Sequence, residues 1–257
     1  MFIDTHCHLT NRYIPLCQGS GGQAKNADEV IARAAASGVG ALICACAEPG
    51  DFESAIALAE KHKNVFATIG IHPDTAGKAT PDYGYLLSHP KVVGVGEIGL
   101  DYHYNAENKN QQIELFRAQL EIARCANLPI AVHSRDVEED IAAALDGSVG
   151  GVMHCFTGSW DFAAKMLDQG FYFSASGIIT FKNSNELREV FAKIPLDRIV
   201  IETDAPWCAP VPFRGKPCEP AMVAQTARVL AETRGLNLPE LEIILEENTK
   251  RLYPKLK

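Results

Sequence analysis

The sequence predicts an α/β fold, a (β/α)8 barrel formed by one domain that spans residues 1–257. Short apolar runs rich in valine and isoleucine alternate with longer amphipathic stretches along the whole chain, as strands alternate with helices. Eight such units in 257 residues match the usual size of this barrel. A doubly wound sheet would carry a glycine-rich phosphate loop after its first strand, and the sequence has no such motif there and no Pro/Ser-rich linker.

Eight apolar runs are the predicted strands, and each is followed by a stretch with helical periodicity. Because runs that are apolar throughout are buried on both faces, we expect parallel strands covered by helices. After the fourth run, apolar residues recur at the spacing of one helix face: Ile113, Phe116, Leu120 and Ala123. The glycine-rich stretch 19–22 is predicted to be a loop. The predicted strands are residues 2–6, 39–47, 65–71, 92–97, 130–133, 151–154, 171–176 and 199–203.

The composition restricts the partners and the compartment. The chain has 24 Lys and Arg against 32 Asp and Glu, a formal charge of −8, which disfavours a broad surface for duplex DNA, so any nucleic acid must be held locally. No apolar run is long enough to cross a membrane and the N-terminus does not resemble an export signal. Eight cysteines without a CxxC pair indicate a reduced, cytoplasmic protein. Nothing in the sequence implies an obligate protein partner.

Polar residues of metal-binding types stand at the ends of the predicted strands. In a barrel of this kind the carboxyl ends of all strands meet at one rim, so side chains that are scattered in sequence converge in space. Four histidines and two carboxylates on five strands make a joint pattern that favours a metal site over isolated structural histidines. The residues at these strand ends are His6, His8, His72, Glu97, His133, His154 and Asp204.

The spacing of these residues predicts two metal ions. His6 and His8 are two positions apart, so in an extended strand both side chains lie on the same face. Closure of the barrel brings Asp204, after the eighth strand, next to this pair. Glu97 and the histidines of the fifth and sixth strands form a second group, and Glu97 could bridge two ions that activate a water and stabilise the attacking and leaving oxygens. Imidazole and carboxylate ligands suit zinc, manganese or iron, and magnesium is also possible.

Other residues near the rim have structural interpretations. Glu202 lies two positions before Asp204 and is expected below the rim, where it would hold a neighbouring group. Cysteines within strands or helices are predicted to be small buried hydrophobes, and two in the loop after the eighth strand are predicted to be exposed. The first set is Cys44, Cys46, Cys125 and Cys155, and the second is Cys208 and Cys218.

Six segments of the chain form an ordered set: DTHCHL at 4–9, GIHP at 70–73, GVGEIGLDY at 94–102, VHSR at 132–135, HCFTG at 154–158 and ETDAP at 202–206. With these segments the chain resembles the TatD family of metal-dependent deoxyribonucleases, a branch of the amidohydrolase-like barrels. The similarity extends almost from end to end and also includes the stretch beginning at Gly170 and the pair Pro220-Ala221 before the last large helix.

The resemblance implies a ligand set and a reaction. By similarity, one divalent metal would be held by His6, His8, Glu97 and Asp204, and a second by Glu97 and the histidines at 133 and 154. The family is associated with hydrolysis of phosphodiester bonds, notably the 3′ to 5′ removal of nucleotides from single-stranded DNA. Asp204, at the metal and able to accept a proton, would then be the general base, and Glu97 the bridging catalytic carboxylate.

Contacts to a nucleic-acid strand are predicted for residues that the metals do not need. His72 and Arg135 are candidates for phosphate contacts, although Arg135 could equally form a salt bridge with Asp101 or Asp136. Aromatic side chains in the loops beyond the rim could stack on bases, or pack under their own loops, and basic ones could bind the backbone. The aromatic candidates are Phe156, Trp160, Phe181, Trp207 and Phe213, and the basic ones are Lys182, Arg214 and Lys216.

Two other functions compete with the nuclease hypothesis. The same barrel and metals could hydrolyse a small phosphoester, an amide or a lactone, and the acidic surface favours this slightly. A binding module without catalysis is the third possibility, but such a protein would be expected to have lost ligands, and every ligand of the pattern is present.

Overall fold

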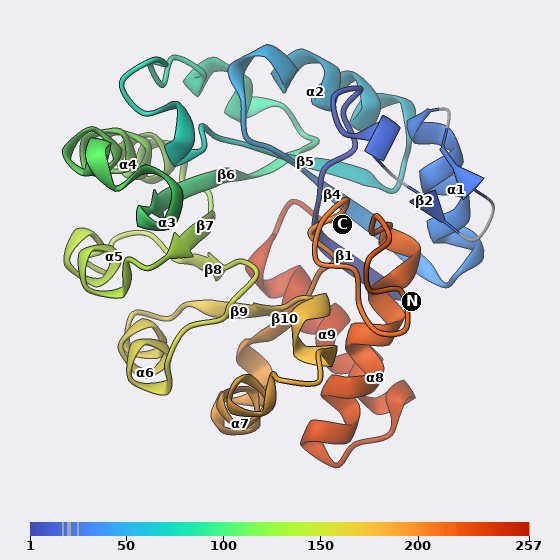
Figure 1. Ribbon diagram of the computed structural model, residues 1–257. Helices are drawn as coiled ribbons and strands as arrows, with labels where there is room; N and C mark the ends of the chain where they lie inside the picture. Colours follow the sequence, from blue (N-terminus) through green and yellow to red (C-terminus); the bar gives the residue numbers. More distant parts are fainter. Residues whose placement is uncertain (17, 20–21, 25, 257) are drawn as a thin grey trace.

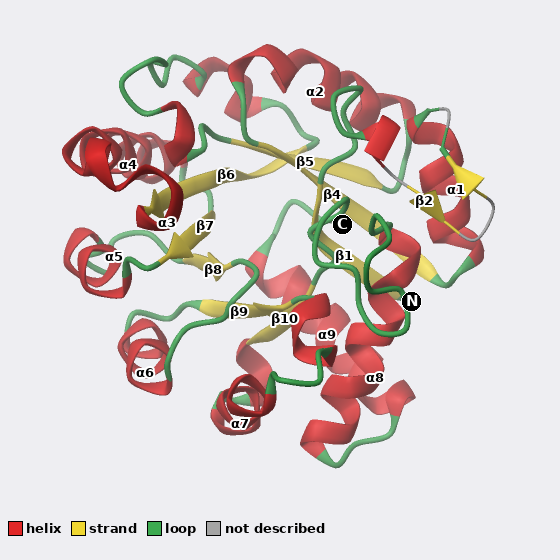
Figure 2. Ribbon diagram, in the orientation of Figure 1, coloured by secondary structure: helices red, strands yellow, loops and turns green. Residues whose placement is uncertain are grey.

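Eight parallel strands follow one another in chain order around a barrel, and the helices form a layer outside them (Figure 1; Figure 2). The computed structural model describes residues 1–16, 18–19, 22–24 and 26–256. The predicted barrel is therefore confirmed. Its strands are β1 (Phe2–Cys7), β4 (Val39–Cys46), β5 (Val65–Ile69), β6 (Val92–Asp101), β7 (Ile130–Arg135), β8 (Gly151–Met153), β9 (Tyr172–Ala175) and β10 (Ile199–Ile201).

The α-helices cover the strands from outside, and most of them connect successive strands. The prediction of a helix after every strand is wrong for β5, which is followed, within the described residues 70–91, only by two short 3-10 helices, Pro73–Thr75 and Gly84–Ser88. No helix in the described ranges is both long and apolar enough to cross a membrane. The two end residues of the glycine-rich stretch predicted as a loop, Gly19 and Gly22, pair with each other in a short antiparallel pair, β2 (Gln18–Gly19) and β3 (Gly22–Gln23). Residues 20–21 lie outside the described residues. The helices are α1 (Ala27–Ala36), α2 (Phe52–Lys61), α3 (Tyr102–Asn105), α4 (Lys109–Ala126), α5 (Glu138–Ala144), α6 (Trp160–Asp168), α7 (Asn185–Lys193), α8 (Val223–Arg234) and α9 (Leu238–Leu252).

The barrel interior is filled near the beginnings of the strands. One residue from each strand contributes to a buried apolar cluster inside the barrel, as is usual for this fold. Leu252, Tyr253 and Leu256, at and after the end of α9, pack against the same cluster and close that end. The functional side chains are therefore left at the opposite rim. The strand residues of the interior cluster are Ile3, Ile43, Phe66, Val93, Ala131, Val152, Tyr172 and Val200.

The barrel closes where β1 meets the segment after β10. The Asp204 N–H donates to the His6 carbonyl at 2.9 Å, and the His8 N–H donates to the Ala205 carbonyl at 2.8 Å. Below these bonds, the fully buried Asp4 carboxyl accepts from the Thr203 N–H at 2.9 Å and from the Thr203 hydroxyl at 2.5 Å. The seam thus fixes His6, His8 and Asp204 relative to one another through backbone bonds.

Removal of the Asp4 carboxyl is expected to weaken this seam. In Asp4→Ala the buried Thr203 N–H and hydroxyl lose their partner, so we expect a loss of about 2–4 kcal/mol in the free energy of unfolding, from two unsatisfied groups. Urea unfolding followed by circular dichroism measures it. Asp82→Ala, at an exposed position, is the matched control. Equal midpoints for the two variants would show that the seam does not depend on Asp4.

Irregular pairing in β1 turns the two histidines toward the interior. Ile3 belongs to the interior cluster, so strict alternation along the strand would place Cys7 inside and His6 and His8 outside. The register between β1 and β4 shifts between Asp4 and Cys7, and Cys7 lies in the outer apolar cluster instead. A bulge of this kind re-aims the side chains that follow it. The prediction that His6 and His8 share a face is correct, but the bulge decides which face.

Strand β6 extends four residues beyond the predicted end at 97. Gly99 pairs with His133 and Asp101 with Arg135 on β7. Gly99 has a φ of +145°, and a Cβ there would lie 2.0 Å from the His133 carbonyl oxygen. Only glycine allows the two backbones to approach so closely. The extension carries Asp101 to the level of the rim histidines.

Candidate metal centre

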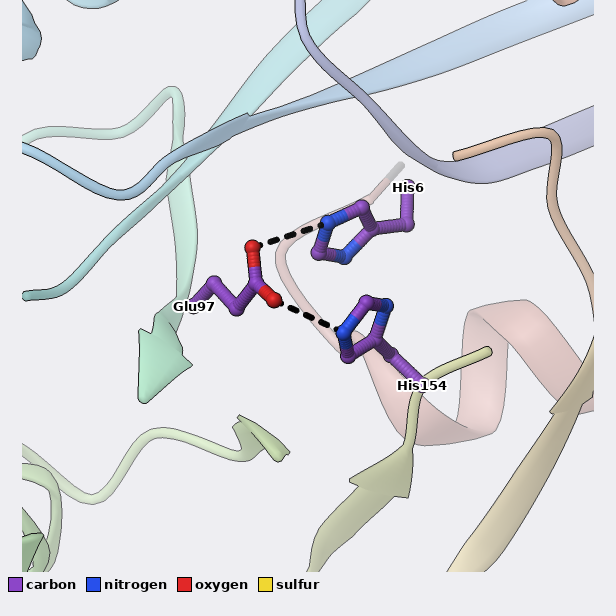
Figure 3. A group of neighbouring side chains, drawn as sticks. All are labelled: His6, Glu97 and His154. Carbon is purple, nitrogen blue, oxygen red and sulfur yellow. Dashed lines mark ion pairs between the residues drawn. The ribbon is translucent and has the colours of Figure 1, made fainter. Parts of the chain in front are cut away.

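Glu97 lies at the centre of the rim cluster, and its two carboxylate oxygens face different groups of histidines. Figure 3 shows one oxygen directed at His6 and the other at His154. The Oε2 atom is 3.5 Å from His6 Nε2, and Oε1 is 2.8 Å from His154 Nε2. The carboxylate is buried and reaches this position from β6, where the register with β7 shifts between Val95 and Ile98.

The Oε2 side of Glu97 is completed by residues of the barrel seam. His8 Nε2 lies 3.8 Å from Glu97 Oε2 and 3.6 Å from Asp204 Oδ1, and His6 Nε2 lies 3.8 Å from the same Asp204 oxygen. Asp204 has a left-handed backbone with φ +57°, a conformation that aspartate tolerates better than most residues. His6, His8 and Asp204 form one of the side-chain groups with metal-ligand geometry.

The Oε1 side of Glu97 is surrounded by three histidines from β7 and from the ends of β5 and β8. His133 Nδ1 lies 2.8 Å from Oε1, and His72 Nε2 lies 3.7 Å from it. The His6 and His154 rings stack with their centroids 4.0 Å apart, which joins the two sides. His72, predicted as a substrate contact, is therefore as close to Glu97 as the predicted ligands, and with Glu97 and His133 it forms a second group of metal-ligand geometry.

The charges in the cluster favour an ionised carboxylate at its centre. Burial raises the pKa of Glu97, but the positive charge on His154 and His72 and the hydrogen bond with His133 outweigh burial and bring the pKa well below its usual value. Burial likewise raises the pKa of Asp204, and His8, His154 and His6 lower it to a net decrease. For His154 the two carboxylates of Glu97 and Glu202 overcome burial and raise the pKa well above its usual value.

Two carboxylates behind the cluster orient its histidines. Asp101 Oδ2 lies 3.1 Å from His133 Nε2, and Glu202 Oε1 lies 3.3 Å from His154 Nδ1. Such partners fix the tautomer and ring orientation of histidine ligands. The prediction that Glu202 holds a neighbouring group is confirmed, whereas Asp101 was not recognised as part of the site. In the sequence Asp101 is visible only as an acidic residue two positions after Gly99. Its place in the site follows from the extension of β6 beyond residue 97.

The donor set fits divalent metal ions. His6 Nε2 is buried and has no hydrogen-bond partner among the described residues, which is costly unless something occupies the space in front of it. The Nε2 atoms of His6 and His8 lie 3.5–3.8 Å from the nearest carboxylate oxygens of Glu97 and Asp204. These separations exceed hydrogen-bond length and leave room for an ion about 2.0–2.2 Å from each atom. Imidazole nitrogens with carboxylate oxygens are ligands for zinc, manganese or iron.

The comparisons with known proteins agree with this donor set. The family described as TatD related DNase matches residues 3–254. The chain belongs to the TatD family of metal-dependent hydrolases. Among curated relatives, the uncharacterized metal-dependent hydrolase YabD of Bacillus subtilis is 39% identical, with 98% of this chain and 99% of YabD covered. The 3′-5′ ssDNA/RNA exonuclease TatD of Salmonella typhimurium is 32% identical, with 90% and 94% covered.

A solved structure shows the same architecture. The TatD homologue YJJV from Escherichia coli superposes with a TM-score of 0.87 at 33% identity, and the match covers 98% of each chain. The barrel of this TatD-family chain is thus shared with this homologue over 98% of each chain.

The residues predicted to contact substrate have different environments in this TatD-family protein. Arg135 is exposed and lies over the Tyr104 ring, 4.8 Å from its centroid, instead of pairing with Asp101 or Asp136. Phe156 is wrong as a stacking candidate, because it is buried against Phe173. The other aromatic candidates are partly buried or exposed: Trp160, Phe181, Trp207 and Phe213. The basic candidates are all exposed: Lys182, Arg214 and Lys216.

The predictions for three cysteines are wrong. Cys155 lies in a turn after β8 and is only partly buried, although the sequence predicts it within a strand or helix. Cys125 is exposed, because it lies on the outer face of α4. Cys218 is fully buried, and its Sγ approaches the Thr203 carbonyl oxygen at 3.9 Å, because its loop folds back over the seam of the barrel. Cys155 and Cys208 are both partly buried at the rim.

Proposed function

We propose that this TatD-family protein hydrolyses phosphodiester bonds and removes nucleotides from the 3′ end of single-stranded DNA, with two divalent metal ions bridged by Glu97. The observation that carries the proposal is the placement of the Glu97 carboxylate, one oxygen toward His6 and the other toward His154. A bridging carboxylate between two ligand groups is typical of centres that cleave phosphodiesters. The name of the Salmonella relative, an ssDNA/RNA exonuclease, supports the substrate class.

In this proposal each metal has its own ligands. His6, His8, Glu97 and Asp204 hold one ion, and Glu97 with His133 and His154 holds the other. Bound Zn²⁺, Mg²⁺ or Mn²⁺ ions supply a water of lowered pKa and positive charge for the phosphate oxygens. The residues of this chain fix the positions of those ions: the seam holds the first set, and Asp101 and Glu202 orient the second.

Asp204 is proposed as the general base. Its pKa stays below its usual value although it is buried, so the carboxylate is ionised at neutral pH and can accept a proton. Its Oδ1 atom faces His6 and His8, so Oδ2, which lies 3.6 Å from Cys208 Sγ, is the oxygen proposed to take a proton from the attacking water.

His72 and Arg135 are proposed to contact the phosphates. His72 Nε2 reaches the centre on the Oε1 side of Glu97 and so can donate to a phosphate oxygen there. Arg135 is exposed on β7, and its guanidinium carbon lies 4.8 Å from the Tyr104 ring centroid, a contact that would hold it in place for a phosphate of the next nucleotide.

Trp207 is proposed as a stacking platform for a base. It follows Asp204 in the loop after β10, is 46% exposed, and its ring lies edge-on to His8 with the centroids 5.0 Å apart. A base that stacks on its exposed face would place the adjoining phosphate near the metal ligands.

Trp207→Ala is expected to weaken use of DNA and not of small esters. The loss of one stacked base costs about 1–3 kcal/mol, so kcat/KM on single-stranded DNA should fall about tenfold or more, mainly through KM. Hydrolysis of bis(4-nitrophenyl) phosphate, which reaches the metals without a strand, should change little. Trp207→Phe is the matched control and should retain most of the DNA activity. An equal loss on both substrates would contradict a stacking role.

The direct test uses a 5′-labelled single-stranded DNA. With Mg²⁺ or Mn²⁺ we expect a ladder that shortens from the 3′ end, and no product when a chelator is present. If the DNA stays intact while a small phosphoester, amide or lactone is cleaved in a metal-dependent reaction, the nuclease proposal is overturned and the second enzyme class is favoured.

The cytoplasmic location suggested by cysteine usage stays a prediction.

A further inference from the structure

Two cysteines adjoin the metal centre and have no part in the proposed function. Cys155 follows His154 after β8, and Cys208 follows Trp207 in the loop after β10. Their Sγ atoms are 3.9 Å apart, and Cys208 Sγ lies 3.6 Å from Asp204 Oδ2. Both side chains are partly buried.

From this geometry we infer that Cys155, Cys208 and Asp204 form a second binding site, which shares Asp204 with the hydrolytic centre, for a thiophilic divalent cation of the Zn²⁺ or Cd²⁺ class. Two thiolates about 2.3 Å from a tetrahedral zinc ion are ~3.8 Å apart, and a thiolate and a carboxylate oxygen on the same ion are ~3.5 Å apart. The observed separations of 3.9 Å and 3.6 Å match both values. The three ligand atoms are all within 4.8 Å of one another.

The backbone around the cluster supports a site of its own. In the described part of the chain five non-glycine residues have a left-handed φ, and three of them are these ligands: Cys155 at +43°, Asp204 at +57° and Cys208 at +52°. Cysteine is rarely found there. Such conformations persist where the surroundings impose them and are concentrated at functional positions.

A buried carboxylate that is paired with His154 through one oxygen also adjoins Cys155. Glu202 accepts the Cys155 N–H at 2.8 Å through Oε1. Its Oε2 atom is buried and has no hydrogen-bond partner within the described residues. An unpaired buried oxygen is costly, and a cation on the adjacent thiolates would lower that cost.

Asp204 connects this dithiol site with the hydrolytic centre. Its Oδ1 faces His6 and His8, and its Oδ2 faces Cys208. A cation bound to Oδ2 would occupy the oxygen that is proposed to accept the proton. The dithiol site would therefore inhibit an enzyme that works with Mg²⁺ or Mn²⁺ when a thiophilic metal is present. Each cysteine binds as a thiolate, and its proton passes to solvent.

The binding test is Cd²⁺ titration of the reduced protein, followed by the ultraviolet thiolate-to-cadmium charge-transfer band. Nitrogen and oxygen ligands do not produce this band, so the hydrolytic centre stays silent. We expect saturation at one thiolate-bound ion, with affinity about tenfold or more weaker in Cys155→Ser and Cys208→Ser. Cys125→Ser, which alters an exposed cysteine on α4, is the matched control and should behave like the parent.

A second measurement does not depend on variants that could fail to fold. Alkylation of the unsubstituted protein followed by peptide mass spectrometry should show Cys155 and Cys208 protected by Cd²⁺ and Cys125 unprotected. Absence of the charge-transfer band, or equal alkylation of Cys208 with and without Cd²⁺, would overturn the site.

The inhibition test rests on the proposed function. With Mn²⁺ as the activating ion, added Zn²⁺ should inhibit DNA hydrolysis by the parent at lower concentration than by Cys208→Ser, by about tenfold. Equal inhibition of both would refute the connection through Asp204. If neither protein cleaves DNA at all, the nuclease proposal fails while the spectroscopic test of the dithiol site still stands.

Discussion

Glu97→Gln is expected to lower kcat/KM for phosphodiester cleavage by roughly 10³-fold or more, the scale seen when a group that stabilises transition-state charge is lost. The amide keeps the shape of the side chain but lacks the charge, and only one of its two terminal atoms can accept a metal. Because Glu97 Oε2 faces His6 and Oε1 faces His154, the substitution disables one side of the bridge. Metal analysis of the dialysed protein should show the loss of at least one bound ion.

The fold should survive this substitution, since Glu97 lies outside both apolar clusters. The circular dichroism spectrum of the variant is expected to equal that of the parent. Glu247→Gln, at an exposed position on α9, provides the matched control and should keep full activity and metal content. A folded Glu97→Gln protein with near-parental turnover would remove the bridging model.

Gly99→Ala is expected to destabilise the barrel by about 3–5 kcal/mol, at the upper end of single substitutions. The new Cβ would lie 2.0 Å from the His133 carbonyl oxygen, and the φ of +145° is unfavourable for any residue with a side chain. Either β6 and β7 must separate or the backbone must change. Urea unfolding measures the loss, and metal content should fall as well, because His133 moves with its carbonyl.

The control for this substitution is Gly150→Ala, at the residue just before β8. A Cβ there meets no atom within 4 Å, so the free energy of unfolding should change by less than about 1 kcal/mol. If Gly99→Ala unfolded at the same urea concentration as this control, close approach of the two strands would not be what holds β6 in place.

Much of the fold and of the site can be predicted from the sequence. Each of the eight apolar runs is buried by helices on one side and the barrel interior on the other, so its composition reports its environment directly. Since parallel strands place all their carboxyl ends at one rim, polar residues at those ends had to converge. The clustering of His6, His8, Glu97 and Asp204 follows from these two facts.

The side chains around that cluster depended on contacts between distant segments. Asp101 reaches His133 because β6 continues past its predicted end, with Gly99 against the β7 backbone. Phe156 is buried and Arg135 lies on Tyr104, since each loop packs against the nearest available surface. Periodicity within one segment contains no information about such partners.

The sequence by itself determined the barrel, the order of its strands and the residue types at the rim, because these depend on local periodicity and on chain connectivity. Only the tertiary structure decided that His6 and His8 face inward, through the bulge in β1, and that Cys155 and Cys208 meet beside Asp204. Bulges and loop conformations are set by the packing of strands and loops far apart in sequence, so they are decided when the barrel closes.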